Sequence, residues 1–69
     1  MASIKGLRDH TGLLQSELAR KLGVKTAAIS HYERGLRRPR YDIATRIVQV
    51  AQDAGYPMVL DDVLRAPGP

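Results

Sequence analysis

Apolar residues recur at three- and four-residue intervals along most of the chain, and glycines separate the runs. Leu18 and Leu22 share one face of a helix predicted at about 15–22. A second helix is predicted at about 26–34. Gly23 separates the two, because glycine readily takes the left-handed conformation that ends a helix. The pattern therefore predicts two short helices joined by a tight turn.

Three further helices are predicted around this pair. Ser3 can cap a short first helix, which Gly12 ends. A longer helix over 42–54 carries an apolar stripe at helical spacing. This stripe consists of Ile43, Ile47, Val50, Ala51 and Ala54. Residues 61–65 are predicted to form one or two turns of a last helix. The expected fold class is therefore all-α, as one compact five-helix domain.

Length and composition limit the possible functions. The chain has 69 residues, enough for one domain, and no apolar run reaches the ~20 residues of a membrane span. The N-terminus lacks the long apolar core of a signal peptide. The absence of cysteine excludes disulfides and zinc–thiolate sites. We expect a cytoplasmic domain over residues 1–65 without metal or cofactor, and a disordered tail at 66–69.

The charge of the chain is unevenly distributed. Residues 1–46 carry ten Lys and Arg against four Asp and Glu, whereas residues 47–69 carry one Arg against three Asp. A basic body with an acidic end favours a polyanionic partner on one face. Solubility alone explains such a charge equally well, so the charge does not decide the function.

The predicted helix at 26–34 has distinct inward and outward sides. Ile29 and Tyr32 face the core, and at about 100° per residue Glu33 also leans inward. The outward side consists of Ala27, Ser30, His31 and Arg34. A helix that reads base edges in the major groove of DNA has such a short, polar face. An ordinary solvated helix can have one too.

Several short motifs follow one another in a fixed order along the chain. They are Leu7-Arg8, Gly12-Leu13, Gln15, Glu17-Leu18-Ala19, Leu22-Gly23-Val24, Ile29-Ser30, Tyr32-Glu33, Gly35 and Pro39. This ordered set resembles the phage repressor and Cro family of helix-turn-helix domains, a group of xenobiotic-response-element-like regulators. The resemblance covers about residues 4–64. It implies a lambda-repressor-like DNA-binding domain that binds double-stranded operator DNA as a homodimer.

The resemblance also implies which side chains contact DNA. The base-reading positions are Lys25, Thr26, Ala27, Ser30 and His31. The phosphate-binding positions are Gln15, Ser16, Arg34, Arg37, Arg38 and Arg40. For Gln15 the physics agrees, because helix N-termini offer free N–H groups to anions. The alignment slips by one residue near Leu36, and a solvated basic loop is the alternative for the arginines that follow.

Arg8 and Glu33 match a family pair that forms a buried salt bridge between the first and third helices. The inward angle of Glu33 supports this assignment, which makes the pair structural rather than a DNA contact. Leu14 and Lys25 depart from the family, because Ser, Thr or Asn usually caps these helix starts. A missing cap costs about 1 kcal/mol. At Lys25 we interpret this loss as tolerated for the sake of DNA contact.

The connector after the fourth helix is rich in apolar side chains. They are Tyr56, Pro57, Met58, Val59 and Leu60. The connector either folds back to complete the core or forms a homodimer interface, which we favour. An extended strand over 57–60, paired across a two-fold axis, is a further possibility.

The favoured function is a transcription regulator of a phage or mobile element that acts by occupying its operator. The alternative is a DNA-binding antitoxin or interaction module whose C-terminal segment binds another protein. An enzyme is disfavoured, because His10 and His31 lie on different helices with no carboxylate pair or phosphate loop nearby. We therefore assign no catalytic residue, no small-molecule substrate and no membrane partner.

Overall fold

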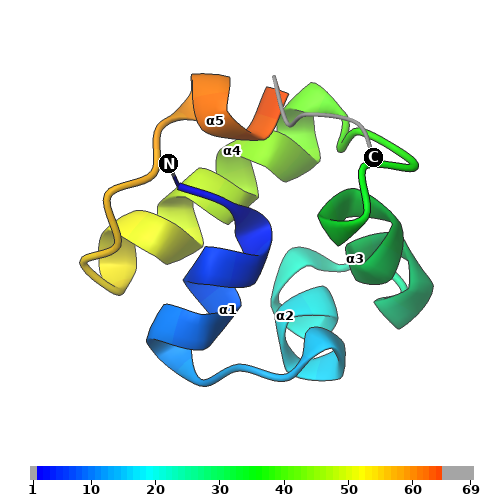
Figure 1. Ribbon diagram of the computed structural model, residues 1–69, viewed down its shortest axis with the longest axis horizontal. Helices are drawn as coiled ribbons and strands as arrows, with labels where there is room; N and C mark the ends of the chain where they lie inside the picture. The colour runs from blue at the N-terminus through cyan, green and yellow to red at the C-terminus, as the bar shows by residue number, and fades with distance from the viewer. Residues whose placement is uncertain (1, 65–69) are drawn as a thin grey trace.

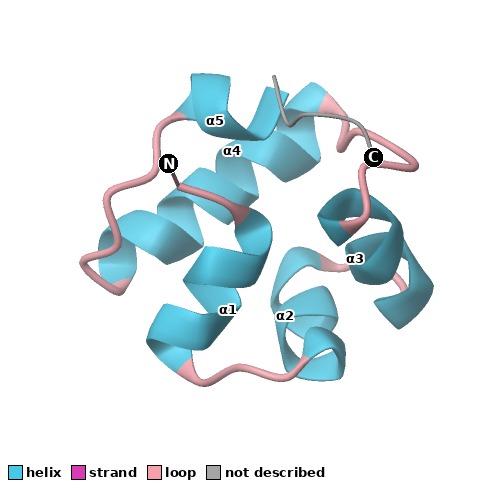
Figure 2. Ribbon diagram, in the orientation of Figure 1, coloured by secondary structure: helices cyan, strands magenta, loops and turns pink. Residues whose placement is uncertain are grey.

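The computed structural model describes residues 2–64, which fold into five helices without a strand in that range (Figure 1). The helices are α1 (Ile4–Thr11), α2 (Gln15–Leu22), α3 (Thr26–Glu33), α4 (Tyr41–Asp53) and α5 (Leu60–Leu64). Short loops connect them (Figure 2). The all-α five-helix prediction is confirmed, and the helix ends predicted within residues 2–64 are correct to within one residue. The predicted end of the last helix, residue 65, lies outside the described residues. The tail predicted at 66–69 lies outside the described residues.

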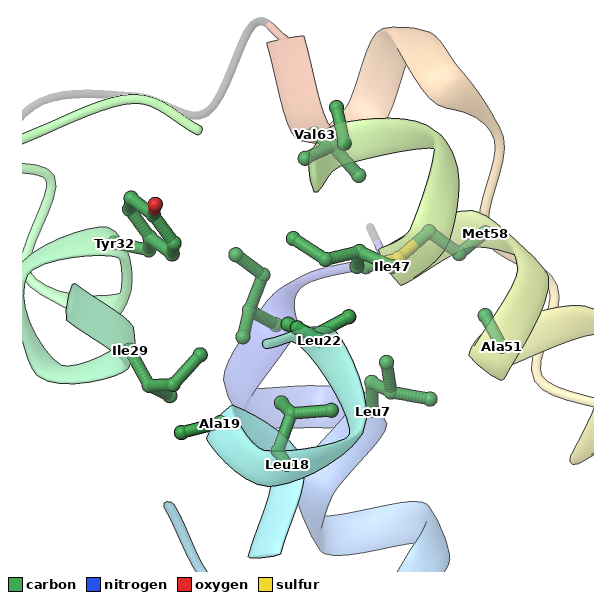
Figure 3. Packing of buried hydrophobic residues seen from close by; sticks show 12 residues of the cluster. Leu7, Leu18, Ala19, Leu22, Ile29, Tyr32, Ile47, Ala51, Met58 and Val63 are labelled. Atoms are coloured by element: carbon green, nitrogen blue, oxygen red, sulfur yellow. The ribbon is translucent and has the colours of Figure 1, made fainter. Parts of the chain in front are cut away.

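Every helix contributes to a single core (Figure 3). Leu7 of α1, Leu18 of α2, Ile29 of α3 and Ile47 of α4 are completely buried, and Val63 of α5 is 1% exposed. The longest helix, α4, has 13 residues, and none of the helices over residues 2–64 is long and apolar enough to cross a membrane.

The buried face of α4 differs from the predicted stripe. Ala44, which was not predicted to be in the stripe, is fully buried together with Ile47 and Ala51. These three positions follow the helical spacing of one narrow face. The predicted residues on either side of that face, which are only partly buried, are Ile43, Val50 and Ala54.

The connector between α4 and α5 folds back onto the domain. Met58 is 3% exposed, so its side chain completes the core. Tyr56 packs on α1, where its hydroxyl accepts a hydrogen bond from the Ser3 N–H at 3.2 Å and its ring lies 5.3 Å from that of His10. A Cβ atom on Gly6 would collide with the Tyr56 hydroxyl. Met58 is therefore a core residue of the domain, and the dimer interface predicted over residues 56–60 stays a prediction.

The backbone of the connector is not free to pair as a strand. The Tyr56 N–H donates to the C-terminal end of α4, and the Met58 N–H donates to the Tyr56 carbonyl, both at 2.8 Å. The Val59 N–H donates to Asp62 Oδ2 at 2.9 Å, and Pro57 has no N–H. Strand pairing across a two-fold axis would need these donors, so residues 56–59 do not support that possibility.

Candidate nucleic-acid interface

The turn between α2 and α3 sets the angle at which α3 leaves the domain. Ala19 is 2% exposed where α2 packs on α3, which requires a small residue. Gly23 has a φ of 74°, a left-handed value that costs other residues about 1–2 kcal/mol. The next N–H, of Val24, donates to the Ala19 carbonyl at 3.0 Å. From α4, Arg46 Nη1 donates to the Leu22 carbonyl at 3.1 Å and so braces the end of α2.

Three of the five predicted base-reading residues have side chains that are exposed to solvent. Lys25, Thr26 and Ala27 are exposed at the N-terminal end of α3, whereas Ser30 and His31 are partly buried. The His31 Nδ1 atom is buried without a hydrogen-bond partner in the described part of the chain. The Nδ1 atom of His31 is therefore not available to a ligand.

The loop from α3 to α4 is basic and anchored at two points. Pro39 is buried, and the Leu36 N–H donates to the His31 carbonyl at 2.9 Å. Figure 1 shows this loop in green at the upper right edge of the molecule, between the end of α3 and the start of α4. A pocket of about 350 Å³ separates α3 from the loop and the start of α4, and His31, Arg37 and Arg40 all line it. The arginines of the loop, all of them exposed, are Arg37, Arg38 and Arg40.

Three helices begin without a hydrogen bond to the side chain of their N-cap residue, although at α2 the Glu17 carboxylate accepts a hydrogen bond from the Leu14 N–H at 2.8 Å. In α1, Ser3 Oγ accepts a hydrogen bond from the Gly6 N–H at 2.9 Å, but no such bond exists at the starts of α2, α3 and α4. The residues at these three starts are Leu14, Lys25 and Arg40. Such starts leave first-turn N–H groups free for an anion. The sequence indicated the first two, but Arg40 was missed because α4 begins one residue earlier than predicted.

A hydrogen-bonded network joins α1, α2 and α3. Arg8 donates to Glu33 through both Nε and Nη2, the latter reaching Oε1 at 3.1 Å. Gln15 Nε2 also donates to Glu33 Oε1, at 3.0 Å, a contact that the sequence did not predict. The side chains of Arg8 and Glu33 are 18% and 9% exposed, so the pair is largely but not completely buried.

The network keeps Glu33 ionised. Burial alone would raise the pKa of this carboxyl, but hydrogen bonds from Arg8 and Gln15 and the charge of Arg8 together hold the pKa below its ordinary value. The hydrogen bond to Glu33 likewise raises the pKa of Arg8. Both partners are therefore charged at neutral pH.

A helix-turn-helix family model matches residues 4–52 of this chain, well over half of its length. The chain belongs to the helix-turn-helix family of the phage repressor and Cro type. Its members are DNA-binding transcription regulators, a non-catalytic class. No curated protein and no solved structure matches the chain.

The helix-turn-helix match spans α1 to most of α4, including every predicted base-reading and phosphate-binding residue. It stops before the connector and α5. Along the matched segment, the exposed start of α3 follows the uncapped start of α2 and precedes the basic loop. The family match thus covers the candidate DNA face and leaves Tyr56–Leu60 to be interpreted from the structure alone.

Proposed function

We propose that this helix-turn-helix protein binds double-stranded operator DNA as a homodimer and regulates transcription by occupying the operator. The observation that carries the proposal is the exposed N-terminal half of α3, with Lys25, Thr26 and Ala27 facing solvent. A helix presented in this way fits the major groove. The helix dipole and the free N–H groups at its start favour the phosphates beside the groove.

The phosphates of the DNA backbone would be held from two sides of α3. Gln15 and Ser16 begin α2, where first-turn N–H groups lack partners among the described residues. On the other side, Arg34 and the loop arginines are exposed. Contacts of this kind position α3 and supply affinity without reading the sequence.

Direct reading of bases is modest in this proposal. Thr26 and Ala27 can contact a thymine methyl group, and Ser30 can bond to several bases, but none makes the bidentate contact worth about 1–3 kcal/mol. Lys25 and His31 have the longest reach. Specificity must then depend on DNA shape and on pairing two half-sites in a dimer.

The proposed dimer interface lies on the connector and α5. Val59 is 60% exposed, Pro57 is exposed, and Leu60 and Leu64 are partly buried. These side chains remain available after Tyr56 and Met58 have packed inward. The same exposed set would serve an antitoxin that binds a different protein, so the oligomeric state of the purified chain separates the two functions. We place the regulator in the cytoplasm of a bacterium or phage-infected cell, where it would meet operator DNA.

Selection of bound sequences from random duplexes, followed by titration at several salt concentrations, tests the proposal. Five to seven phosphate contacts per monomer predict a dimer whose log–log salt slope is roughly −9 to −12. The selected sequences should be palindromic. No enriched sequence, or an affinity that does not change with salt, would refute the proposal.

Two lysines provide a matched pair of variants for the same titration. Lys25→Ala should weaken binding and reduce the salt slope by about 1 per monomer, since Lys25 lies at the start of α3. Lys21→Ala is the control, because Lys21 lies beside Thr11, Val50 and Asp53, away from α3. Equal losses from both variants would argue against α3 as the reading helix.

A further inference from the structure

A carboxylate at the end of α3 holds an amide at the start of α2. Gln15 Nε2 donates to Glu33 Oε1 at 3.0 Å, and Arg8 binds both oxygens of the same carboxylate. Arg8 Nη1 also donates to the Leu13 carbonyl at 3.3 Å, which fixes the loop before α2. The position of the Gln15 side chain is therefore set from α1 and α3.

An ionised carboxylate can only accept hydrogen bonds, whereas an amide has a donating and an accepting end. Glu33 therefore selects the orientation in which the Gln15 nitrogen faces it. The opposite orientation would place two oxygens against each other. The selected nitrogen carries a second N–H, which has no partner among residues 2–64. Gln15 is itself the first residue of α2, whose first-turn backbone N–H groups have no partner among the described residues.

We propose that Glu33 is a positioning residue for a DNA phosphate contact, which it prepares by orienting the amide of Gln15. One N–H of Gln15 stays on Glu33 and the other binds a phosphate oxygen together with the start of α2. This inference rests on the proposed function, because the phosphate belongs to operator DNA. It gives Glu33 a role in recognition beyond its stabilising pair with Arg8.

Arg8 makes this arrangement compatible with a polyanion. A lone carboxylate near the phosphate would repel it, but the bidentate contact from Arg8 offsets that charge. The same contact lowers the pKa of Glu33, so the carboxylate is ionised at neutral pH and can accept a hydrogen bond from the amide.

A double-mutant cycle tests the inference with a duplex selected as described above. Gln15→Ala should weaken binding roughly tenfold per monomer through loss of a hydrogen bond to a charged group. The salt slope should stay unchanged, because Gln15 is neutral. Glu33→Gln should weaken binding severalfold in the wild-type background and have no further effect in the Gln15→Ala background. The same fold-loss from Glu33→Gln in both backgrounds would overturn the inference.

NMR of the wild-type protein provides a second measurement that does not depend on the variants folding. In the free protein, the Gln15 side-chain amide proton that is held on Glu33 should exchange slowly with water and lie away from the chemical shift of an unrestrained amide proton. The exposed Gln52 is the control for an unrestrained amide. On adding the duplex, the second proton of Gln15 should move and the first should not. A Gln15 amide that exchanges with water as fast as the Gln52 amide in the free protein, or movement of both Gln15 protons on binding, would overturn the inference.

Failure of the proposed function would look different. A wild-type protein that binds no duplex would refute operator binding, whatever the free-protein spectrum shows. A second outcome separates the two proposals. If the protein binds DNA, but the losses from Gln15→Ala and Glu33→Gln are additive and the Gln15 amide is unrestrained, operator binding stands and the positioning role of Glu33 is refuted.

Discussion

Replacing Gly6 by alanine tests how closely the connector packs on α1. Helix propensity alone predicts that alanine inside a helix gains about 1 kcal/mol over glycine. In this structure, however, a Cβ atom on Gly6 would collide with the Tyr56 hydroxyl and lie 3.2 Å from the ring carbon that carries it. Overpacking of this kind costs about 1–3 kcal/mol, and displacing the hydroxyl also loses its hydrogen bond with Ser3, worth about 1 kcal/mol.

The expected net effect of Gly6→Ala is a loss of about 1–3 kcal/mol in the free energy of unfolding, opposite in sign to the propensity rule. Urea denaturation followed by circular dichroism measures it. Tyr56→Phe provides the matched background, since it removes the oxygen and keeps the ring. There, Gly6→Ala should be about neutral. A Gly6→Ala protein more stable than wild type would refute the packing of Tyr56 on α1.

The remaining predictions concern the ion pair and the apolar connector. Glu33→Ala should lower the free energy of unfolding by about 3 kcal/mol, the low end of the range for breaking a buried pair because this pair is partly exposed. Native thermal stability combined with weak DNA binding would contradict that expectation. Because folding lowers the pKa of Glu33, its stabilisation is present above the ordinary value of 4.5 and is lost as pH falls through the folded value. Acid should therefore destabilise the wild type more than Glu33→Gln in denaturation at pH 7 and pH 3. Val59→Asp should give folded monomers by sedimentation, whereas Met58→Ala should cost about 2–5 kcal/mol of stability. A Val59→Asp dimer would exclude that surface as the interface.

Local sequence pattern was sufficient for the helices and their turns. Spacing of apolar residues located α2 and α3, and Gly23 marked the turn where a positive φ occurs. The helical angle of Glu33 pointed it inward, where the structure has it bound to Arg8. The helices, the turn and the inward angle depend on residues close in sequence, so periodicity and turn chemistry report them directly. The pairing of Glu33 with Arg8, 25 positions away, came instead from the family resemblance.

Contacts between distant residues were not accessible in this way. Tyr56 meets Ser3 across 53 positions, and Gln15 meets Glu33 across 18. Both contacts depend on how complete helices are docked. The inward and outward sides of the connector at 56–60 were also not predictable from the sequence, because its apolar residues are consecutive. Periodicity cannot tell which of Met58 and Val59 faces the core, and the structure buries the first and exposes the second.

The uncapped starts of α2, α3 and α4 imply that DNA would complete the folding of the protein that binds it. In free solution, amide hydrogens in these first turns should exchange quickly with water, and bound phosphates would slow them. Part of the binding energy would then be used to order helix ends. Leu14→Ser should stabilise the free protein by about 1 kcal/mol and reduce the rise in melting temperature on adding DNA. Incomplete helices would in this way make the bound state the most rigid form of the domain.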